Sequence, residues 1–279
     1  MLSAPRLRGR ATLAFLLVPP MAWLVIAYLG SLAVLMVSAF WSRNSFTGAV
    51  VHTFTLDNLA RLFTDEVVRT TTVRTVGVAV AVTLLCAVLA VPLALYMAKV
   101  ASPGLRIALV VAVTTPLWAS YLVKAYAWRM LLSPEGPLAW ATGFSPGYGL
   151  VATVLTLTYL WLPYMVIPVF AAFQRVPDAL MDASSDLGAS DLTTLRLVAA
   201  PMVFPGIAAG SIFTFSLSLG DYIAVTIVGG KTQMLGNIIY GQLVTANNQP
   251  LAAALSIIPL AAIILYLLAM RRTGALENV

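Results

Sequence analysis

The amino-acid sequence predicts an all-α integral membrane protein with six transmembrane helices, folded as a single domain over residues 1–279. Apolar residues make up 61% of the chain and charged residues only 9%, whereas soluble chains carry about 25% charged residues. The mean hydropathy of +0.95 points the same way. The apolar residues also gather into six runs, each near the length of about 20 residues that a helix needs to cross a bilayer.

The first apolar run, residues 11–40, follows three arginines, Arg6, Arg8 and Arg10. A secretory signal peptide has a similar basic start, but its apolar core contains only about 7–15 residues. Because this run is about twice as long, we expect an uncleaved first membrane span.

Five further runs complete the expected set of spans, at residues 75–97, 107–131, 150–173, 206–228 and 251–270. An even number of spans places both termini on one side of the membrane. Lysine and arginine are more frequent in the termini and loops of that side than on the opposite side. By the positive-inside tendency, we expect the termini and the loop 174–206 to be cytoplasmic.

The rare residue types exclude several functions. The chain has one cysteine, Cys86, and one histidine, His52. These cannot form a disulfide framework, a thiolate cluster or a two-histidine metal site within the chain, and His52 has no matching serine signature for a catalytic triad. We therefore expect no metal and no cofactor in this chain. The net charge of +6 fits basic cytoplasmic loops beside a lipid bilayer, so we expect no nucleic-acid partner.

The segment Gly229-Gly230-Lys231-Thr232 looks like the end of a phosphate-binding loop. That motif also needs a glycine five residues before its last glycine, where this chain has Val225. We therefore expect that this chain does not bind ATP. If ATP drives the system, a separate ATPase subunit must bind the ATP and its magnesium ion.

The most polar long segment is residues 174–206, between the fourth and fifth apolar runs. A short helix is expected over 179–187, and Gly188 suits the left-handed position just past its end. Ser190 and Asp191 begin a second helix, which leads through Pro201 and Pro205 into the next apolar run. A helix, a glycine corner and a helix between two spans predict a docking element, although an ordinary loop with two short helices remains the alternative.

This segment resembles the coupling loop of ABC-transporter permeases, which reads Glu-Ala-Ala, three residues, Gly and a distant Pro. Aspartate replaces the usual glutamate here, and serine replaces the second alanine. The resemblance implies that residues 174–206 contact a cytoplasmic ATPase. The residues expected to couple to it are Asp182, Ala183, Ser184, Asp186, Gly188 and Pro201.

A second resemblance covers residues 216–248, where Leu-Gly-Asp-Tyr, a Gly-Gly pair and Leu-Gly-Asn follow in order. The first permease of spermidine/putrescine importers carries the same series. This implies a MetI-like, all-helical permease of a bacterial inner membrane, a transport subunit rather than an enzyme, with a polyamine as solute. The implied partners are a second homologous permease, two cytoplasmic ATPase subunits and an extracytoplasmic binding protein. Permeases for opine, iron or sulfate share part of the series. Two alternatives remain: an importer of the same class for an opine, iron, sulfate or phosphonate, and a secondary transporter.

Asp221 lies about fifteen residues into the expected fifth span, with Tyr222 beside it. An ionisable group inside a span costs on the order of 3 kcal/mol on insertion scales and is by default a functional candidate. We expect Asp221 and Tyr222 to line a translocation path that attracts cations. The alternative is a structural carboxylate that accepts hydrogen bonds from hydroxyls such as those of Ser216 or Ser218.

Lys124 and Arg129 lie among tyrosines and a tryptophan in the outer part of the expected third span. Basic side chains of this kind reach toward the membrane surface from an aromatic belt, which explains them without a role in binding. Contact with the substrate is the alternative.

Overall fold

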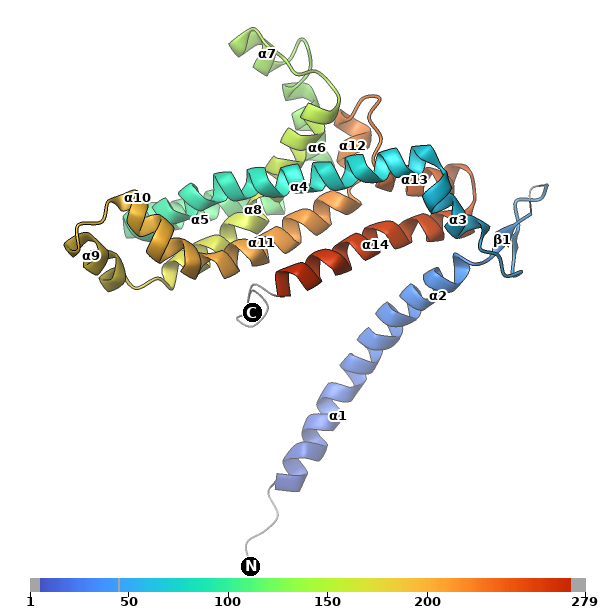
Figure 1. The fold of residues 1–279 in the computed structure, drawn as a ribbon, viewed down its shortest axis with the longest axis horizontal. Coiled ribbons are helices and arrows are strands. Elements are labelled where there is room, and N and C mark those ends of the chain that lie inside the picture. The colour runs from blue at the N-terminus through green and yellow to red at the C-terminus, as the bar shows by residue number, and fades with distance from the viewer. Residues whose placement is uncertain (1–5, 45, 272–279) are drawn as a thin grey trace, which may run out of the picture.

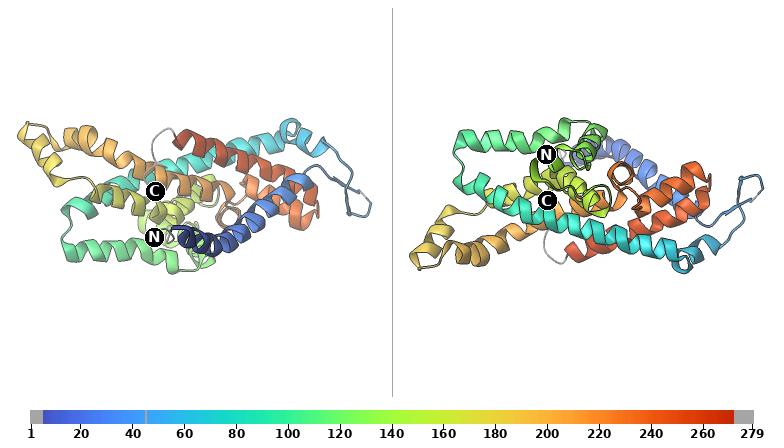
Figure 2. Two further views of the ribbon diagram at one scale, coloured as in Figure 1. Left: turned by 90° about the horizontal axis from the view of Figure 1, so that it is seen from below. Right: turned by 90° about the horizontal axis from the view of Figure 1, so that it is seen from above.

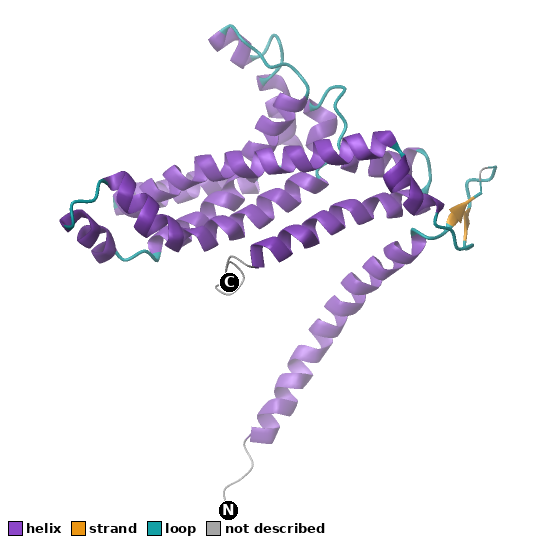
Figure 3. Ribbon diagram, in the orientation of Figure 1, coloured by secondary structure: helices purple, strands orange, loops and turns teal. Residues whose placement is uncertain are grey.

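The computed structural model describes residues 6–44 and 46–271, almost entirely as helices (Figures 1 and 3). In the first part of the chain these are α1 Arg6–Leu24, the π-helical turn η1 Val25–Leu29, α2 Gly30–Ser38, α3 Asp57–Thr64, α4 Glu66–Leu95 and η2 Tyr96–Val100. Between α2 and α3, β1 Ser42–Arg43 and β2 Val50–Val51 form an antiparallel hairpin in which Ser42 pairs with Val51.

The rest of the described chain is helical apart from its connecting loops. Its middle part holds α5 Pro103–Trp118, α6 Tyr121–Leu131, α7 Pro137–Thr142, α8 Leu150–Gln174 and α9 Asp178–Asp186. Its last part holds α10 Asp191–Thr194, η3 Leu195–Ala199, α11 Ala200–Gly220, α12 Ile223–Val228, α13 Leu235–Tyr240, η4 Gly241–Thr245 and α14 Gln249–Arg271.

Helices α4, α8 and α11 pack side by side along the long axis of the molecule, and α14 lies against α11 (Figure 1). At one end of this bundle are α9 and α10, and at the other are α3, α13 and the hairpin. Both views in Figure 2 keep these two groups at opposite extremes. We call these the α9 end and the α13 end.

Two glycines bring α8 and α11 into close contact. A Cβ atom at Gly206 would lie 2.8 Å from the carbonyl oxygen of Pro168, and one at Gly210 would lie 2.7 Å from Met165 Sδ. Small residues four apart share one helix face and let two backbones approach inside a membrane. The core around this contact includes Cys86, Phe173 and many alanines. The pair Gly206-x-x-x-Gly210 is therefore a helix-packing signal that hydropathy alone did not reveal.

Helices α1 and α2 swing away from the bundle (Figure 1). In the most apolar window of the span Phe15–Ser38, only 6% of the residues are buried within the described chain, although this span is about as apolar as the packed spans. Only the end of this span packs against the bundle, where Ala39 contacts Ala253 and Ala254 of α14. Asn58 Nδ2 also donates to the carbonyls of Ala39 and Trp41, at 3.0 and 2.8 Å.

Five described helices are long and apolar enough to cross a membrane, and α5 with α6 supplies a sixth span if the bent pair counts as one. The third span expected over 107–131 is not one continuous helix. The chain bends by 100° between α5 and α6, where Ala119 and Ser120 are extended. Pro116 lies in the last turn of α5, and Lys124 Nζ donates to its carbonyl oxygen across the corner, at 2.9 Å.

The expected bounds of the fifth span, 206–228, are wrong, because one unbroken helical run extends from Asp191 to Gly220. Pro201 does not end the helix. A π-helical turn, η3, precedes it, and there the N–H of Ala200 donates to the carbonyl of Leu195, five residues back. This wider register lets the helix pass a residue that has no N–H to donate.

Candidate coupling loop and substrate path

Helix α9 occupies residues 178–186, within one residue of the expected helix at each end. Pro177 is extended and fixes the chain before the helix, and Asp178 places a carboxylate in the first turn, where the helix dipole favours negative charge. The apolar content of α9 is low, so its position depends on contacts at its two ends.

The glycine corner after α9 has the expected conformation. Gly188 has φ of +80°, in the left-handed region. The N–H groups of Gly188 and Ala189 donate to the carbonyls of Ser185 and Ser184, at 2.9 and 3.1 Å. These bonds satisfy carbonyls that the end of a helix leaves unpaired. Ser190 then caps α10 by accepting from the N–H of Thr193, so the expected second helix begins where the sequence indicated.

Two polar contacts attach α9 to the bundle. Lys99, at the end of η2, donates through Nζ to Asp178 Oδ1 and to the carbonyl of Val176, each at 2.6 Å. The hydrogen bond and charge of Lys99 hold the pKa of Asp178 below its usual range. Farther along, the hydroxyls of Ser184 and the buried Thr194 lie 2.8 Å apart. Ser184 therefore links α9 to α10.

The opposite face of α9 is open to solvent. Asp182, Ala183 and Asp186 are exposed, and Leu187 is 89% exposed. Within the described chain, the carboxylates of Asp182 and Asp186 make no hydrogen bond or ion pair. Two carboxylates and an apolar side chain thus project from the α9 end, while Met181 packs against the core on the other side. This arrangement suits contact with another protein.

Pro201 lies apart from this exposed face, in the first turn of α11. Of the six residues expected to couple, Asp182, Ala183 and Asp186 form the open face. Ser184 and Gly188 set the shape of the loop, and Pro201 shapes the helix behind it.

Asp221 lies just past the end of α11 rather than within a continuous helix, since α11 stops at Gly220. It is 8% exposed. Tyr121 Oη, at the start of α6, donates to Asp221 Oδ2, and the N–H of Ala224 donates to Oδ1 at 2.9 Å. The expected alternative partners, Ser216 and Ser218, are not bonded to it. Asp221 therefore joins three elements, α6, α11 and α12.

The side chain of Tyr222 contacts α13, whereas that of Asp221 contacts α6. The ring of Tyr222 stacks on Tyr240 with centroids 4.8 Å apart, and the Tyr222 carbonyl accepts from Asn237 Nδ2 at 3.0 Å. The ring lines an apolar pocket of about 390 Å³ with residues of α11, α13 and η4. The structure thus separates the two residues that the sequence placed together: Asp221 turns toward α6 and Tyr222 toward α13.

Lys124 and Arg129 are occupied by backbone carbonyls. Lys124 bridges the corner between α5 and α6, as described above. Arg129 Nη1 donates to the carbonyl of Ile227 in α12, and its guanidinium lies 4.5 Å from the ring centroid of Tyr148. Both side chains hold elements together, a role that the pattern of basic and aromatic residues alone did not reveal.

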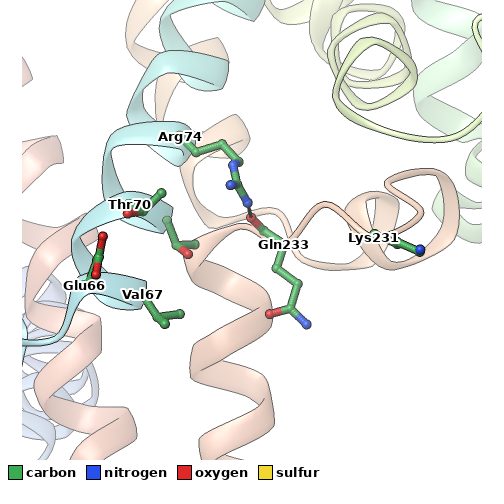
Figure 4. Close-up of a pocket in the computed structure, with 7 residues that line it drawn as sticks. Glu66, Val67, Thr70, Arg74, Lys231 and Gln233 are labelled. Carbon is green, nitrogen blue, oxygen red and sulfur yellow. Dashed lines mark hydrogen bonds between the residues drawn. The ribbon is translucent and has the colours of Figure 1, made fainter.

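The glycine pair at 229–230 begins the loop between α12 and α13, near the α13 end. Its Lys231 borders a pocket of about 400 Å³ formed with the first turns of α4 (Figure 4). Arg74 Nη1 donates to the carbonyl of Gln233 at 3.2 Å and fastens the loop to α4. In Figure 4, Lys231 points away from Arg74 and Glu66, so the charged groups of this pocket do not converge on one point.

Long apolar helices, a bent helix pair and an exposed helix–glycine–helix loop together define a multi-pass membrane transport component. Residues 88–273 match the model of the family described as "Binding-protein-dependent transport system inner membrane component". The chain belongs to this family. It is an ABC importer permease of the inner membrane, a transport component and not an enzyme, as the sequence predicted.

Two curated relatives from Escherichia coli K12 align over nearly the whole chain. The inner membrane ABC transporter permease protein YdcU is 41% identical over 288 aligned positions, covering 95% of this chain and 90% of the relative. The spermidine/putrescine transport system permease protein PotB is 30% identical over 277 positions, covering 94% and 98%. The resemblance to the spermidine/putrescine permease family is confirmed at this level.

A solved structure shares the fold. A chain of a bacterial ABC transporter that imports the acidic polysaccharide alginate superimposes with a TM-score of 0.71 at 18% identity, covering 95% of this chain and 96% of the other. The expected MetI-like, all-helical fold is therefore confirmed.

Proposed function

We propose that this chain forms, with a second homologous permease, the membrane path of an ATP-driven importer for a polyamine such as spermidine or putrescine. The observation that carries the proposal is Asp221. It is the one charged residue buried among the residues that the structure describes, and it lies in the Leu-Gly-Asp-Tyr series that the spermidine/putrescine permeases share. The 30% identity to PotB supports the same solute class.

The charge of the solute gives this assignment its physical basis. A polyamine carries two or more positive charges at neutral pH, and a carboxylate on its path offsets part of the cost of removing its water. An anion would be repelled by the same carboxylate. Asp221 has two oxygens and about four acceptor positions, and Tyr121 and Ala224 use only part of them. An arriving ammonium group can therefore bind without first displacing Tyr121.

The α9 end suits contact with the ATPase. In this proposal two cytoplasmic ATPase subunits, which bind ATP and magnesium, each receive one coupling loop, and an extracytoplasmic binding protein delivers the solute at the α13 end. Closing of the ATPases then moves α9 as a rigid body and changes access to the path. Both termini lie in the cytoplasm in this arrangement, as the basic residues of that side indicate.

Transport in vesicles tests the solute. With all subunits and the binding protein reconstituted, we expect ATP-dependent uptake of labelled spermidine or putrescine, reduced by an excess of the unlabelled compound. Uptake of sulfate, phosphonate or an opine without polyamine uptake would overturn the polyamine assignment and leave the importer class in place. Uptake driven by an ion gradient without ATP would favour a secondary transporter instead.

Accessibility labelling tests the orientation. In a variant that lacks Cys86, single cysteines at Ser190 and at Thr47 in the hairpin lie at opposite ends of the bundle, and both positions are exposed. We expect an impermeant thiol reagent outside the cell to label only the cysteine at position 47. Labelling of both from outside would contradict a cytoplasmic coupling loop.

A further inference from the structure

A row of aromatic side chains begins at Asp221 and crosses three helices. Tyr121 of α6 stacks beside Trp161 of α8, with ring centroids 6.0 Å apart. Trp161 is followed by Tyr164 at 5.9 Å, and Tyr164 by Phe213 of α11 at 6.4 Å. We call these four residues the aromatic row. Because Tyr121 also donates to Asp221, the row and the carboxylate form one continuous structure.

The row leads from Asp221 toward the α9 end. Phe213 and Asp221 are eight positions apart along α11, which corresponds to about 12 Å at a rise of about 1.5 Å per residue. Helix α11 begins at the α9 end (Figure 1), so Phe213 is deeper along the bundle than Asp221. The row therefore lies on the side of Asp221 that faces the α9 end.

The rings lie at the edge of the core, where Tyr121 and Trp161 pack against buried core residues but none of the four rings is fully buried. Phe213 is 54% exposed, and Tyr121, Trp161 and Tyr164 are partly exposed. A carboxylate at the head of the row argues against a surface that faces lipid tails, because ionisable groups in membrane segments face the interior of the assembly or water. Two polar side-chain atoms, Trp161 Nε1 within the row and Ser218 Oγ in α11, are buried without a hydrogen-bond partner among the described residues. Ser218 precedes Asp221 by one turn of helix.

We propose that the aromatic row is a track for alkylammonium groups. This inference rests on the proposed polyamine function and names the groups that would carry the solute inward. Ammonium groups bind over aromatic faces within about 6 Å of the ring centroid. Neighbouring centroids of the row lie 5.9 to 6.4 Å apart, so an ammonium group that leaves one ring comes within reach of the next. Asp221 receives one ammonium group, and the rings hold successive ammonium groups while the methylene segments pack against them. Neutral and anionic solutes gain no such stabilisation.

Graded fluorination of Trp161 tests the track without removing the ring. Each added fluorine weakens the negative potential of the indole face and changes its size little. In vesicles that contain all subunits, with binding protein and spermidine saturating, we expect the initial rate of uptake to fall stepwise. The full series should lower it about tenfold. The matched control is the same series at Trp128, which pairs with Tyr159 at 5.3 Å outside the row and should show no trend.

The outcomes separate the two proposals. Spermidine uptake by the wild type with no fluorine trend at Trp161 would overturn the track and leave the polyamine assignment intact. Equal trends at Trp161 and Trp128 would also overturn it, because the effect would then come from packing. A wild type that imports another solute and no polyamine would overturn both. A second substitution, Phe213→Leu, should lower uptake as well, and normal uptake by this variant would count against the track.

Discussion

The carboxylates at the α9 end and the carboxylate at the head of the aromatic row are held in opposite ways. Asp182 and Asp186 lie in the open without partners in the described chain, whereas Asp221 is buried and bonded from two directions. The shape of the α9 end comes from its backbone. Pro177 precedes the helix, Gly188 turns the chain behind it, and the N–H groups of Gly188 and Ala189 donate to the last carbonyls of the helix. The surroundings of Asp221 combine the adjoining helices α11 and α12 with Tyr121 of α6, which is 100 positions away in the chain. The first region is arranged to meet a partner, and the second is arranged to hold a charge inside the bundle.

The largest expected effect concerns the shape of the α9 end. Gly188→Arg should leave the permease in the membrane but abolish ATP hydrolysis stimulated by substrate and binding protein. A Cβ at Gly188 would meet nothing within 4 Å in this chain, so the fold itself has room for a side chain. The positive φ costs on the order of 1–2 kcal/mol for a residue other than glycine, and the arginine would also collide with a docked partner. ATPase activity and co-purification of the ATPase measure the effect.

Gly188→Asn is the matched control, because asparagine tolerates the left-handed conformation better than other side chains. It should retain more activity than the arginine variant. Asp182→Lys should impair coupling more mildly, since it reverses one exposed charge and leaves the backbone unchanged. Wild-type values for Gly188→Arg would mean that α9 is not the docking element.

The next effect concerns the buried carboxylate. Asp221→Asn keeps the size and most of the hydrogen bonding but removes the charge, and uptake of a polyamine should fall roughly tenfold while the complex still assembles. Tyr121→Phe removes only the hydroxyl that donates to Asp221 and should have a smaller effect. Uptake in vesicles and size-exclusion profiles of the complex measure the two outcomes. Normal uptake by Asp221→Asn would reduce the carboxylate to a structural role.

These two regions also differ in how far the sequence predicted them. The place of α9 to within one residue at each end, the positive φ of Gly188 and the cap at Ser190 followed from local backbone chemistry, and the structure confirms them. The partner of Asp221 did not follow, because Tyr121 lies 100 positions away in the chain. Hydropathy also located the six apolar runs but not the corner at Ala119 and Ser120, because a bent helix pair is as apolar as a straight helix. Hydropathy likewise does not show the π-helical turn that accommodates Pro201.

Between the two regions, adding a single methyl group at the contact of α8 with α11 should lower the stability of the permease. Gly206→Ala would place Cβ 2.8 Å from the carbonyl oxygen of Pro168, and we expect a loss of about 1–3 kcal/mol of stability from overpacking. Gly77→Ala in α4 is the control, because a Cβ there meets nothing within 4 Å. Unfolding of the purified permease in detergent compares the two. Equal stability of both variants would show that α8 and α11 can separate without loss.

The smallest effect is expected at the attachment of α9 to Lys99. The pKa of Asp178 is lowered by its hydrogen bond to Lys99 and by the charge of that lysine. A carboxyl group with a lowered folded pKa contributes stability above its unfolded pKa, and this contribution is lost as the pH falls through the folded pKa. The contact should thus persist at neutral pH and disappear only below the usual range of aspartate. Carboxyl chemical shifts of Asp178 measure this, and Lys99→Met should return its pKa toward the ordinary value.

The unbroken helix from Asp191 to Gly220 acts mechanically as a lever. Its 30 residues measure about 45 Å at the usual rise of about 1.5 Å per residue. One arm ends at the Ser184–Thr194 hydrogen bond behind α9, and the other ends one residue before Asp221. If the helix pivots near its middle, a tilt of about 10° shifts the tip beside Asp221 by about 4 Å over an arm of about 22 Å. This displacement exceeds the reach of a hydrogen bond. A push on α9 by a nucleotide-driven motor would therefore be enough to pull Asp221 away from Tyr121 and uncover the first ring of the aromatic row.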